Sequence, residues 1–120
     1  MSDTSLDSLF DALEGKELSY EVEPTDKVQS LKSKAQSLEG ELVGGNISVL
    51  YSLLGSDIFP DTRGKILFLE DLDEYLYHID RMMFAFERAG KLDCIKGLFV
   101  GGLTKMHYNT VSFGQPAEEI

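Results

Sequence analysis

The stretch 64-GKILFLEDLDE-74 decides the fold of this chain. Residues 66–69 form an unbroken apolar run that is too short for a helix and typical of a strand buried on both faces. The run ends at Glu70, where a group of acidic side chains begins. Carboxylates at the carboxyl end of a buried strand lie where α/β proteins commonly place chemistry. The sequence therefore predicts a strand that carries a candidate site at its end.

Upstream of this strand, the pattern predicts a short strand and then a helix. Residues 41–43 form the strand, and the turn Gly44-Gly45-Asn46 follows it. Asn46 is a good N-cap, and apolar residues recur at helical spacing over 47–54. The two glycines could present N–H groups to an anion, but they lack the dinucleotide and Walker spacings. The alternative is a tight turn that only leads into the helix.

Downstream, the pattern predicts a longer helix and a second buried strand. Asp71 and Glu74 have the N-cap and N3 spacing of a capping box. An apolar stripe at helical spacing continues over 72–86 until Gly90. Its Met and Phe residues indicate a core or a subunit interface. Residues 98–100 are expected to form the second buried strand.

We assign all 120 residues to one domain. Residues 1–23 hold an entry helix and a strand over 18–22, and residues 24–38 are polar and linker-like. Residues 39–103 are the motif-bearing core, and 104–120 form a tail. Its last residues are Pro116-Ala-Glu-Glu-Ile120, and a proline followed by two acids is how a helix begins. We therefore expect a truncated tail and an incomplete domain.

Composition excludes several classes of protein. The chain has 11 basic and 21 acidic residues and a net charge of −10, which argues against binding nucleic acid. The single cysteine, Cys94, fits a reducing compartment and is expected to be a small buried side chain. The sequence has neither a signal peptide nor an apolar run of transmembrane length. We expect a cytoplasmic protein without nucleic-acid or membrane partners.

The acids that follow the central strand leave several interpretations open. Glu70 could be a catalytic carboxylate, or it could only accept hydrogen bonds from nearby backbone N–H groups. The acids of 70–74 and His78 could instead bind calcium or magnesium. Because the EF-hand spacing and a two-His motif are both missing, we predict no metal site.

Several motifs, taken in order, resemble one family. The segments ELVGGNISVLYSLLGS, GKILFLEDLDEYLYHIDRM, AGKLD and KGLFVGG are similar to the C-terminal part of the LD-carboxypeptidase family. That family includes murein tetrapeptide carboxypeptidases and microcin C self-immunity peptidases. The resemblance is clear over residues 40–102. It implies an α/β fold, namely a small mixed sheet with flanking helices in a β/β/α swivelling-type C-terminal domain.

The resemblance also implies roles for particular residues. Family members are serine peptidases with a Ser–His–Glu triad, whose Ser lies in an N-terminal domain and whose Glu ends a strand of the C-terminal domain. Glu70 matches that Glu and would hold the tautomer of the catalytic His. Gly44, Gly45 and Asn46 would lie near the substrate groove. The catalytic Ser has no counterpart, because no Ser of this sequence lies in a strand–turn–helix elbow. The catalytic His has none either, because neither His78 nor His107 matches its position.

The function implied for the complete enzyme is release of a terminal D-amino acid from murein peptides during peptidoglycan recycling. No metal or organic cofactor is implied, and the family's frequent homodimers make a homodimer one expectation. This chain alone is expected to be inactive. The alternative from another class is a stand-alone, non-catalytic interaction or anion-binding module.

Overall fold

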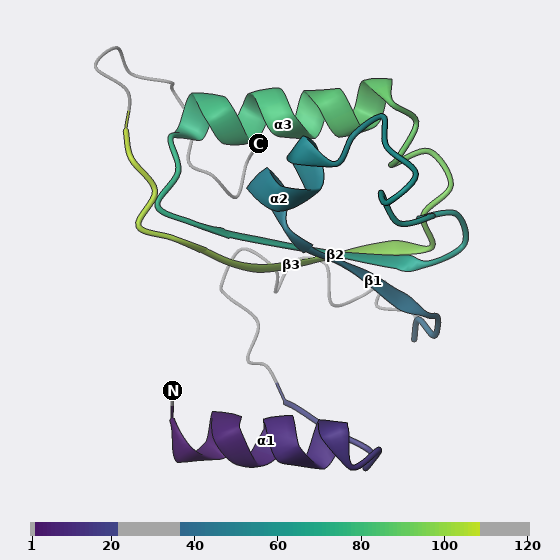
Figure 1. The fold of residues 1–120 in the computed structure, drawn as a ribbon, viewed down its shortest axis with the longest axis vertical. Coiled ribbons are helices and arrows are strands. Elements are labelled where there is room, and N and C mark those ends of the chain that lie inside the picture. The colour runs from purple at the N-terminus through teal and green to yellow at the C-terminus, as the bar shows by residue number, and fades with distance from the viewer. Residues whose placement is uncertain (1, 22–36, 109–120) are drawn as a thin grey trace. The chain divides into compact units, whose positions relative to one another are not determined.

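The computed structural model describes residues 2–21 and 37–108 (Figure 1). The chain was expected to form one domain, and it divides into two compact units, residues 1–36 and 37–120. Most of the linker-like segment lies outside the described residues, and so does the predicted helix start in the tail.

The first unit contains helix α1 (Asp3–Leu13), which has no buried residue. Ser2 caps it by accepting a hydrogen bond from the Ser5 N–H at 3.2 Å. The strand predicted over 18–22 is wrong for its described residues, 18–21, which have no strand conformation. Alternating side chains alone do not form a strand, because the backbone also needs a neighbouring strand to pair with.

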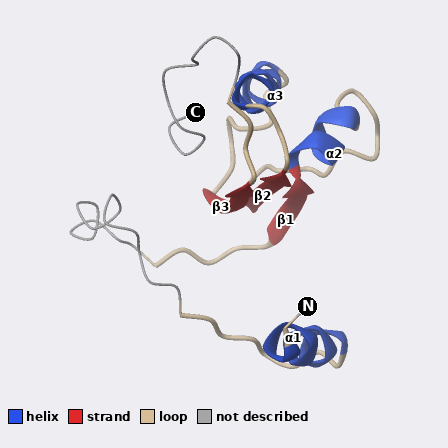
Figure 2. Cartoon of the chain, turned by 90° about the vertical axis from the view of Figure 1, so that its left-hand side faces the viewer, coloured by secondary structure: helices blue, strands red, loops and turns tan. Residues whose placement is uncertain are grey.

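The second unit contains a three-stranded sheet with the order β1 (Leu42–Asn46), β2 (Ile66–Leu72) and β3 (Gly97–Thr104). Helix α2 (Ile47–Ser52) connects β1 to β2, and helix α3 (Leu76–Arg88) connects β2 to β3. Both helices lie on the same face of the sheet (Figures 1 and 2). The predicted α/β class with flanking helices is confirmed.

All strand pairings in the described sheet are parallel, where a mixed sheet was expected. The reason is that each connection crosses over the sheet through a helix, and such a crossover returns the chain in the same direction. Parallel strands bring their carboxyl ends to one edge. The end of β1 therefore lies beside the end of β2, where the acidic side chains begin.

The core lies between β2 and the two helices. Every second residue of β2 is buried, namely Leu67, Leu69 and Asp71, and the residues between them are more exposed. This period of two is that of a strand with one covered face. The buried apolar side chains of this core are Ile47, Leu50, Phe59, Leu67, Leu69, Ile79, Met82 and Phe86. For the Met and Phe residues of this helix the sequence left a core or a subunit interface open, and two of them, Met82 and Phe86, belong to the core.

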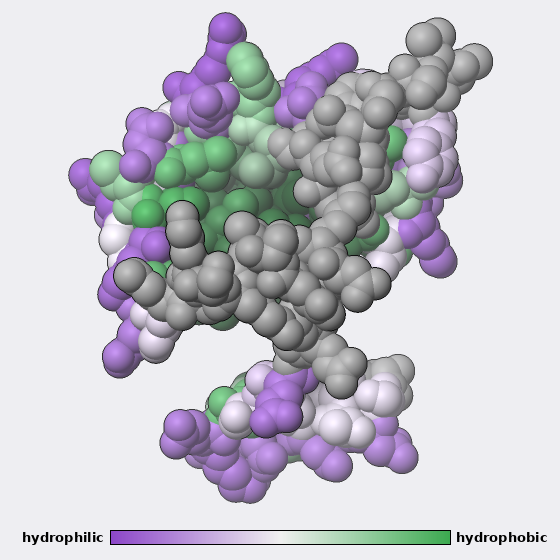
Figure 3. Space-filling model, turned by 180° about the vertical axis from the view of Figure 1, so that it is seen from behind, coloured by the Kyte–Doolittle hydropathy of each residue, from purple (hydrophilic) through white to green (hydrophobic). Residues whose placement is uncertain are grey.

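The other face of the sheet is more open. Phe68 of β2 stacks on Phe99 of β3 with their ring centroids 5.6 Å apart. The strand predicted over 98–100 is confirmed as part of β3. Its predicted burial is wrong, since these residues are 48–53 % exposed. In the described sheet β3 is an edge strand, so it lacks a neighbour on one side. Seen from behind, the second unit has hydrophobic residues gathered at its surface (Figure 3).

Two further sequence predictions need correction. The capping box does not form, because β2 continues to Leu72 and α3 begins only at Leu76, with Tyr75 as its N-cap. Cys94 is exposed rather than buried. It lies in the loop before β3, where its carbonyl oxygen accepts a hydrogen bond from the Gly64 N–H at 2.7 Å.

We expect Gly44→Ala to destabilise the second unit strongly. Gly44 has a φ of +138°, and a Cβ there would overlap the carbonyl oxygen of Phe68 in the neighbouring strand. The expected loss of unfolding free energy is about 2–4 kcal/mol. Gly102→Ala is the matched control, because its Cβ would make only an ordinary contact at 3.5 Å. Urea denaturation of both variants measures the difference, and equal stability would contradict this reading.

Candidate functional site

The site is built where β1 and β2 end side by side. Gly44, Gly45 and Asn46 were expected to form a turn, but they are the last residues of β1. They extend the strand because they pair in parallel register with residues 68–70 of β2. Asn46 lies directly opposite Glu70 and also caps α2, since its Oδ1 accepts a hydrogen bond from the Val49 N–H at 3.0 Å. The predicted cap is confirmed.

Glu70 lies on the open face of the sheet. Its neighbours Leu69 and Asp71 are buried toward the helices, whereas Glu70 is half-buried and shares its face with Phe68. The register with β3 shifts between Leu69 and Asp71, so Glu70 is not paired with β3. On that side lies Gly101, whose Cβ, if present, would stand 3.2 Å from the Glu70 Cβ. The small neighbour leaves room around the Glu70 side chain.

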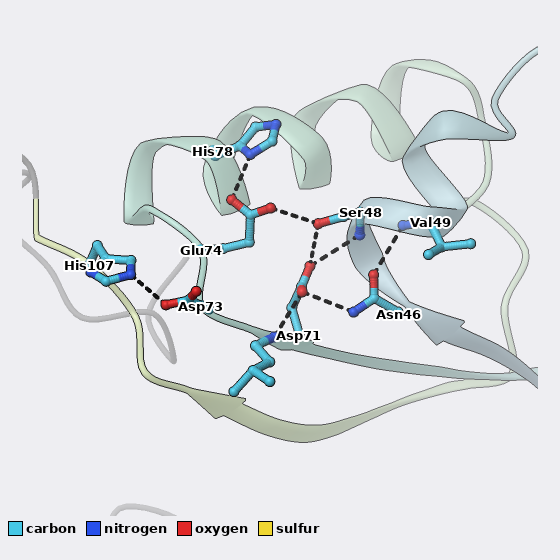
Figure 4. A network of polar contacts seen from close by, with 9 residues as sticks. Asn46, Ser48, Val49, Asp71, Asp73, Glu74, His78 and His107 are labelled. Atoms are coloured by element: carbon cyan, nitrogen blue, oxygen red, sulfur yellow. Dashed lines mark hydrogen bonds and ion pairs between the residues drawn. The ribbon is translucent and has the colours of Figure 1, made fainter.

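Asp71 points the other way, into a set of hydrogen-bond donors (Figure 4). Its Oδ1 accepts from Asn46 Nδ2 at 2.9 Å and from the Leu72 N–H at 2.8 Å. Its Oδ2 accepts from Ser48 twice, at 3.1 Å from the N–H and at 2.7 Å from the hydroxyl. A carboxylate offers about four acceptor positions, and these four bonds occupy them. The buried charge is therefore satisfied within the protein.

A second carboxylate extends this network toward α3. The Ser48 hydroxyl also lies 2.9 Å from Glu74 Oε1, and Glu74 Oε2 lies 2.8 Å from His78 Nδ1 (Figure 4). A hydroxyl carries one proton, so Ser48 serves the two carboxylates by sharing it. The network links the first turn of α2 to the first turn of α3.

Ser48, Glu74 and His78 are the residue types of a hydrolytic triad, but their order is different. In a triad the His contacts the nucleophile and the acid lies behind the His. Here Glu74 lies between the other two, and His78 makes no hydrogen bond with Ser48 in the described structure. Without a His beside its hydroxyl, Ser48 lacks the base that activates the nucleophile of such a triad. We therefore assign these contacts to the architecture of the site.

The surroundings lower the pKa of both carboxyl groups. For Asp71, burial raises the pKa, but the hydrogen bonds from Ser48, Leu72 and Asn46 together outweigh it and leave a net decrease. For Glu74, the hydrogen bond with His78 lowers the pKa most, and burial opposes this effect. Both groups therefore carry negative charge at neutral pH.

The other histidine also has an acidic partner. His107 Nε2 lies 2.6 Å from Asp73 Oδ1, and this contact connects the segment after β3 with the segment after β2. Tyr75 forms an isolated bridge with His107 at the same place. Neither His107 nor His78 is hydrogen-bonded to Glu70 in the described residues.

Sequence reasoning missed Ser48 and misplaced Asp71. The signal available for Ser48 was its position two residues after the N-cap Asn46, in the first turn of a helix that starts at a strand end. A hydroxyl there lies close to whatever follows the neighbouring parallel strand. Asp71 was assigned to a helix cap, although its burial is that of a strand residue.

We expect the acid limb of the stability curve to depend on Glu74. Since its folded pKa is lowered from 4.5, its contribution is present above that pH and lost as pH falls through the folded value. Glu74→Gln should flatten the loss of unfolding free energy as the pH falls below 4.5. Glu87→Gln, an exposed position in α3, is the control. Chemical denaturation at each pH measures both, and parallel curves would refute the contribution.

We also expect no specific divalent-metal site. Within the part of the chain that the structure describes, no three His, Cys, Asp or Glu side chains are arranged to hold an ion. Three of the acids of 70–74 have partners within the protein, namely Asp71, Asp73 and Glu74. Calorimetry with calcium and magnesium should show affinities no tighter than about millimolar. Micromolar binding that disappears in Asp71→Asn would overturn this prediction.

None of the helices in the described residues is both long and apolar enough to cross a membrane.

The chain is similar to several known proteins. A protein of Bacillus subtilis (strain 168) named "Probable murein peptide carboxypeptidase" is 46% identical over 84 residues, which are 70% of this chain and 25% of that protein. The crystal structure of muramoyltetrapeptide carboxypeptidase from Oxalobacter formigenes superposes with a TM-score of 0.60 at 32% identity, over 66% of this chain and 28% of that chain. The chain thus spans about a quarter of the length of these relatives.

A third comparison supports the fold alone. The structure of MccF in complex with glutamyl sulfamoyl guanosine has a TM-score of 0.59 at 23% identity, over 68% of this chain and 24% of that chain.

The sequence also matches the model of the LD-carboxypeptidase C-terminal domain over residues 39–119, which include β1, β2, β3 and the whole network around Asp71. On these grounds the chain belongs to the LD-carboxypeptidase C-terminal domain family.

Proposed function

We propose that this chain is the C-terminal domain of a serine LD-carboxypeptidase and supplies its triad carboxylate, Glu70. The complete enzyme would release a terminal D-amino acid from murein peptides in cytoplasmic peptidoglycan recycling. The observation that carries the proposal is the contrast between two adjacent acids. Asp71 is buried with its acceptor positions filled, whereas Glu70 lies on the open face of the central strand.

The substrate class comes from the relatives. Murein peptides appear in the name of the Bacillus subtilis protein, and muramoyltetrapeptide in that of the Oxalobacter formigenes enzyme. Our proposal extends this substrate class to the protein that contains the present domain. The identity of 46% over 84 residues supports that extension.

The chemistry proposed for Glu70 is that of the third member of a triad. Its carboxylate would accept a hydrogen bond from the N–H of the catalytic His, hold that His in the tautomer that can deprotonate the Ser, and stabilise the imidazolium. Both partners would come from segments that this chain does not contain. The open face around Glu70 leaves a side from which they can approach.

The alternative function, an anion-binding module, has less support than the triad role, because the backbone N–H of Ser48 at the start of α2 already has a partner. The N–H of Ser48, in the first turn of α2, already donates to the carboxylate of Asp71. An external anion would have to displace a buried internal one. We keep Gly44, Gly45 and Asn46 as part of the proposed substrate groove only through their position beside Glu70. A homodimer remains an expectation from the family.

We expect Glu70→Gln to lower turnover strongly without unfolding the protein. The test enzyme is a chimaera in which residues 39–119 of this chain replace the matching part of the Bacillus subtilis relative, assayed by D-alanine release from murein tetrapeptide. The amide would offer its NH₂ group to the His and favour the wrong tautomer, so we expect a loss of roughly 10²–10⁴-fold in kcat. KM should change little.

Glu87→Gln is the matched control for this experiment and should keep the full rate. The melting temperature is measured on the same samples. A Glu70→Gln enzyme with lower stability and an unchanged rate per folded molecule would show that Glu70 is only structural. The 120-residue chain alone should release no D-alanine.

A further inference from the structure

We propose that Asp71 is a positioning residue, which orients the proposed triad carboxylate Glu70 by fixing the end of β2 against β1 and α2. The proposal rests on the function proposed above for Glu70. It concerns how this domain sets the geometry of a carboxylate whose chemical partners lie elsewhere in the enzyme.

The first argument is that Asp71 has no acceptor capacity left for a substrate. It is 3% exposed, and its two oxygens accept four hydrogen bonds from the protein. A group in this state does not exchange protons with a reacting molecule on the opposite face of the sheet. Its effect on catalysis must therefore pass through a neighbour.

The second argument is that the bonds of Asp71 restrain both sides of Glu70. On the β1 side, Asn46 lies directly across from Glu70. Its Nδ2 donates to Asp71, and its Oδ1 accepts from the Val49 N–H. Along β2, the Leu72 N–H donates back to Asp71 at 2.8 Å. The backbone on which Glu70 stands is thus fixed across the ladder and along the strand.

The third argument is that β3 does not provide this restraint. Residues 66–69 of β2 pair with β3, and the pairing resumes at Asp71 after a register shift, so Glu70 lies at the shift. A shifted register re-aims side chains near functional sites and needs local contacts to hold it. The carboxylate of Asp71 supplies such contacts at the residue where pairing resumes.

Asp71→Asn keeps the shape of the side chain but replaces one acceptor oxygen by a donor. On the Oδ1 side this NH₂ group would face the Asn46 NH₂ group and the Leu72 N–H, and on the Oδ2 side it would face the Ser48 N–H, so a donor would oppose a donor in either orientation. The end of β2 would shift, and Glu70 with it. A displacement of about 1 Å at a catalytic group can lower the rate about 10²-fold.

The test is a double-mutant cycle in the chimaeric enzyme, with Glu70→Gln, Asp71→Asn and the double variant. If Asp71 acts through Glu70, Asp71→Asn should lower kcat about 10–10²-fold with KM nearly unchanged when Glu70 is present. The same change should lower kcat less than about 3-fold in the Glu70→Gln background, because the group that it positions is already lost. Equal losses in both backgrounds would overturn the inference.

The outcomes separate this inference from the function on which it rests. A fully active Glu70→Gln enzyme would refute the proposed function. An impaired Glu70→Gln enzyme together with a fully active Asp71→Asn enzyme would refute only the positioning role. Asp57→Asn, at an exposed position, is the control and should keep the full rate.

Ser48→Ala provides a milder variant in case Asp71→Asn does not fold. It removes the hydroxyl contacts to Asp71 and Glu74 and keeps the backbone N–H bond to Asp71. We expect a loss of about 3–10-fold in kcat per folded molecule with Glu70 present, and none in the Glu70→Gln background. A loss of equal size in both backgrounds, or no loss in either, would count against the inference.

Discussion

The buried carboxylate of Asp71 is the constraint on which the rest of this domain depends. A charge withdrawn from water is costly unless hydrogen bonds replace its hydration. Here the replacement comes from three different elements, the end of β1, the first turn of α2 and the end of β2. Satisfying this one group therefore determines where the three elements meet, and with them the position of Glu70.

The period of a strand explains how two adjacent acids can differ so completely. Successive side chains of β2 point to opposite faces, so Asp71 enters the polar network under the helices and Glu70 stays on the open face. Asp71, the buried acid, accepts four hydrogen bonds and stabilises the structure. The outer acid, with a glycine of β3 beside it, is the one that we propose for chemistry.

Local patterns predicted much of the fold, and three-dimensional contacts decided the rest. The apolar run 66–69 and the N-cap Asn46 are visible in the sequence because their signals lie within a few residues. The partner of Asp71 is Ser48, 23 residues away, and no local rule connects the two. Residues 18–21 of the strand predicted over 18–22 do not form a strand for a related reason, since pairing depends on a neighbour that the pattern cannot supply.

The most direct test of this account is an NMR pH titration of the Asp71 carboxyl carbon and the Ser48 amide proton in the 120-residue chain. Because the amide donates to the carboxylate at 3.1 Å, both signals should move together. The account predicts a shared midpoint below 3.8, the ordinary pKa of an Asp side chain. A midpoint at or above 3.8, or an amide proton that does not follow the carboxyl group, would contradict it.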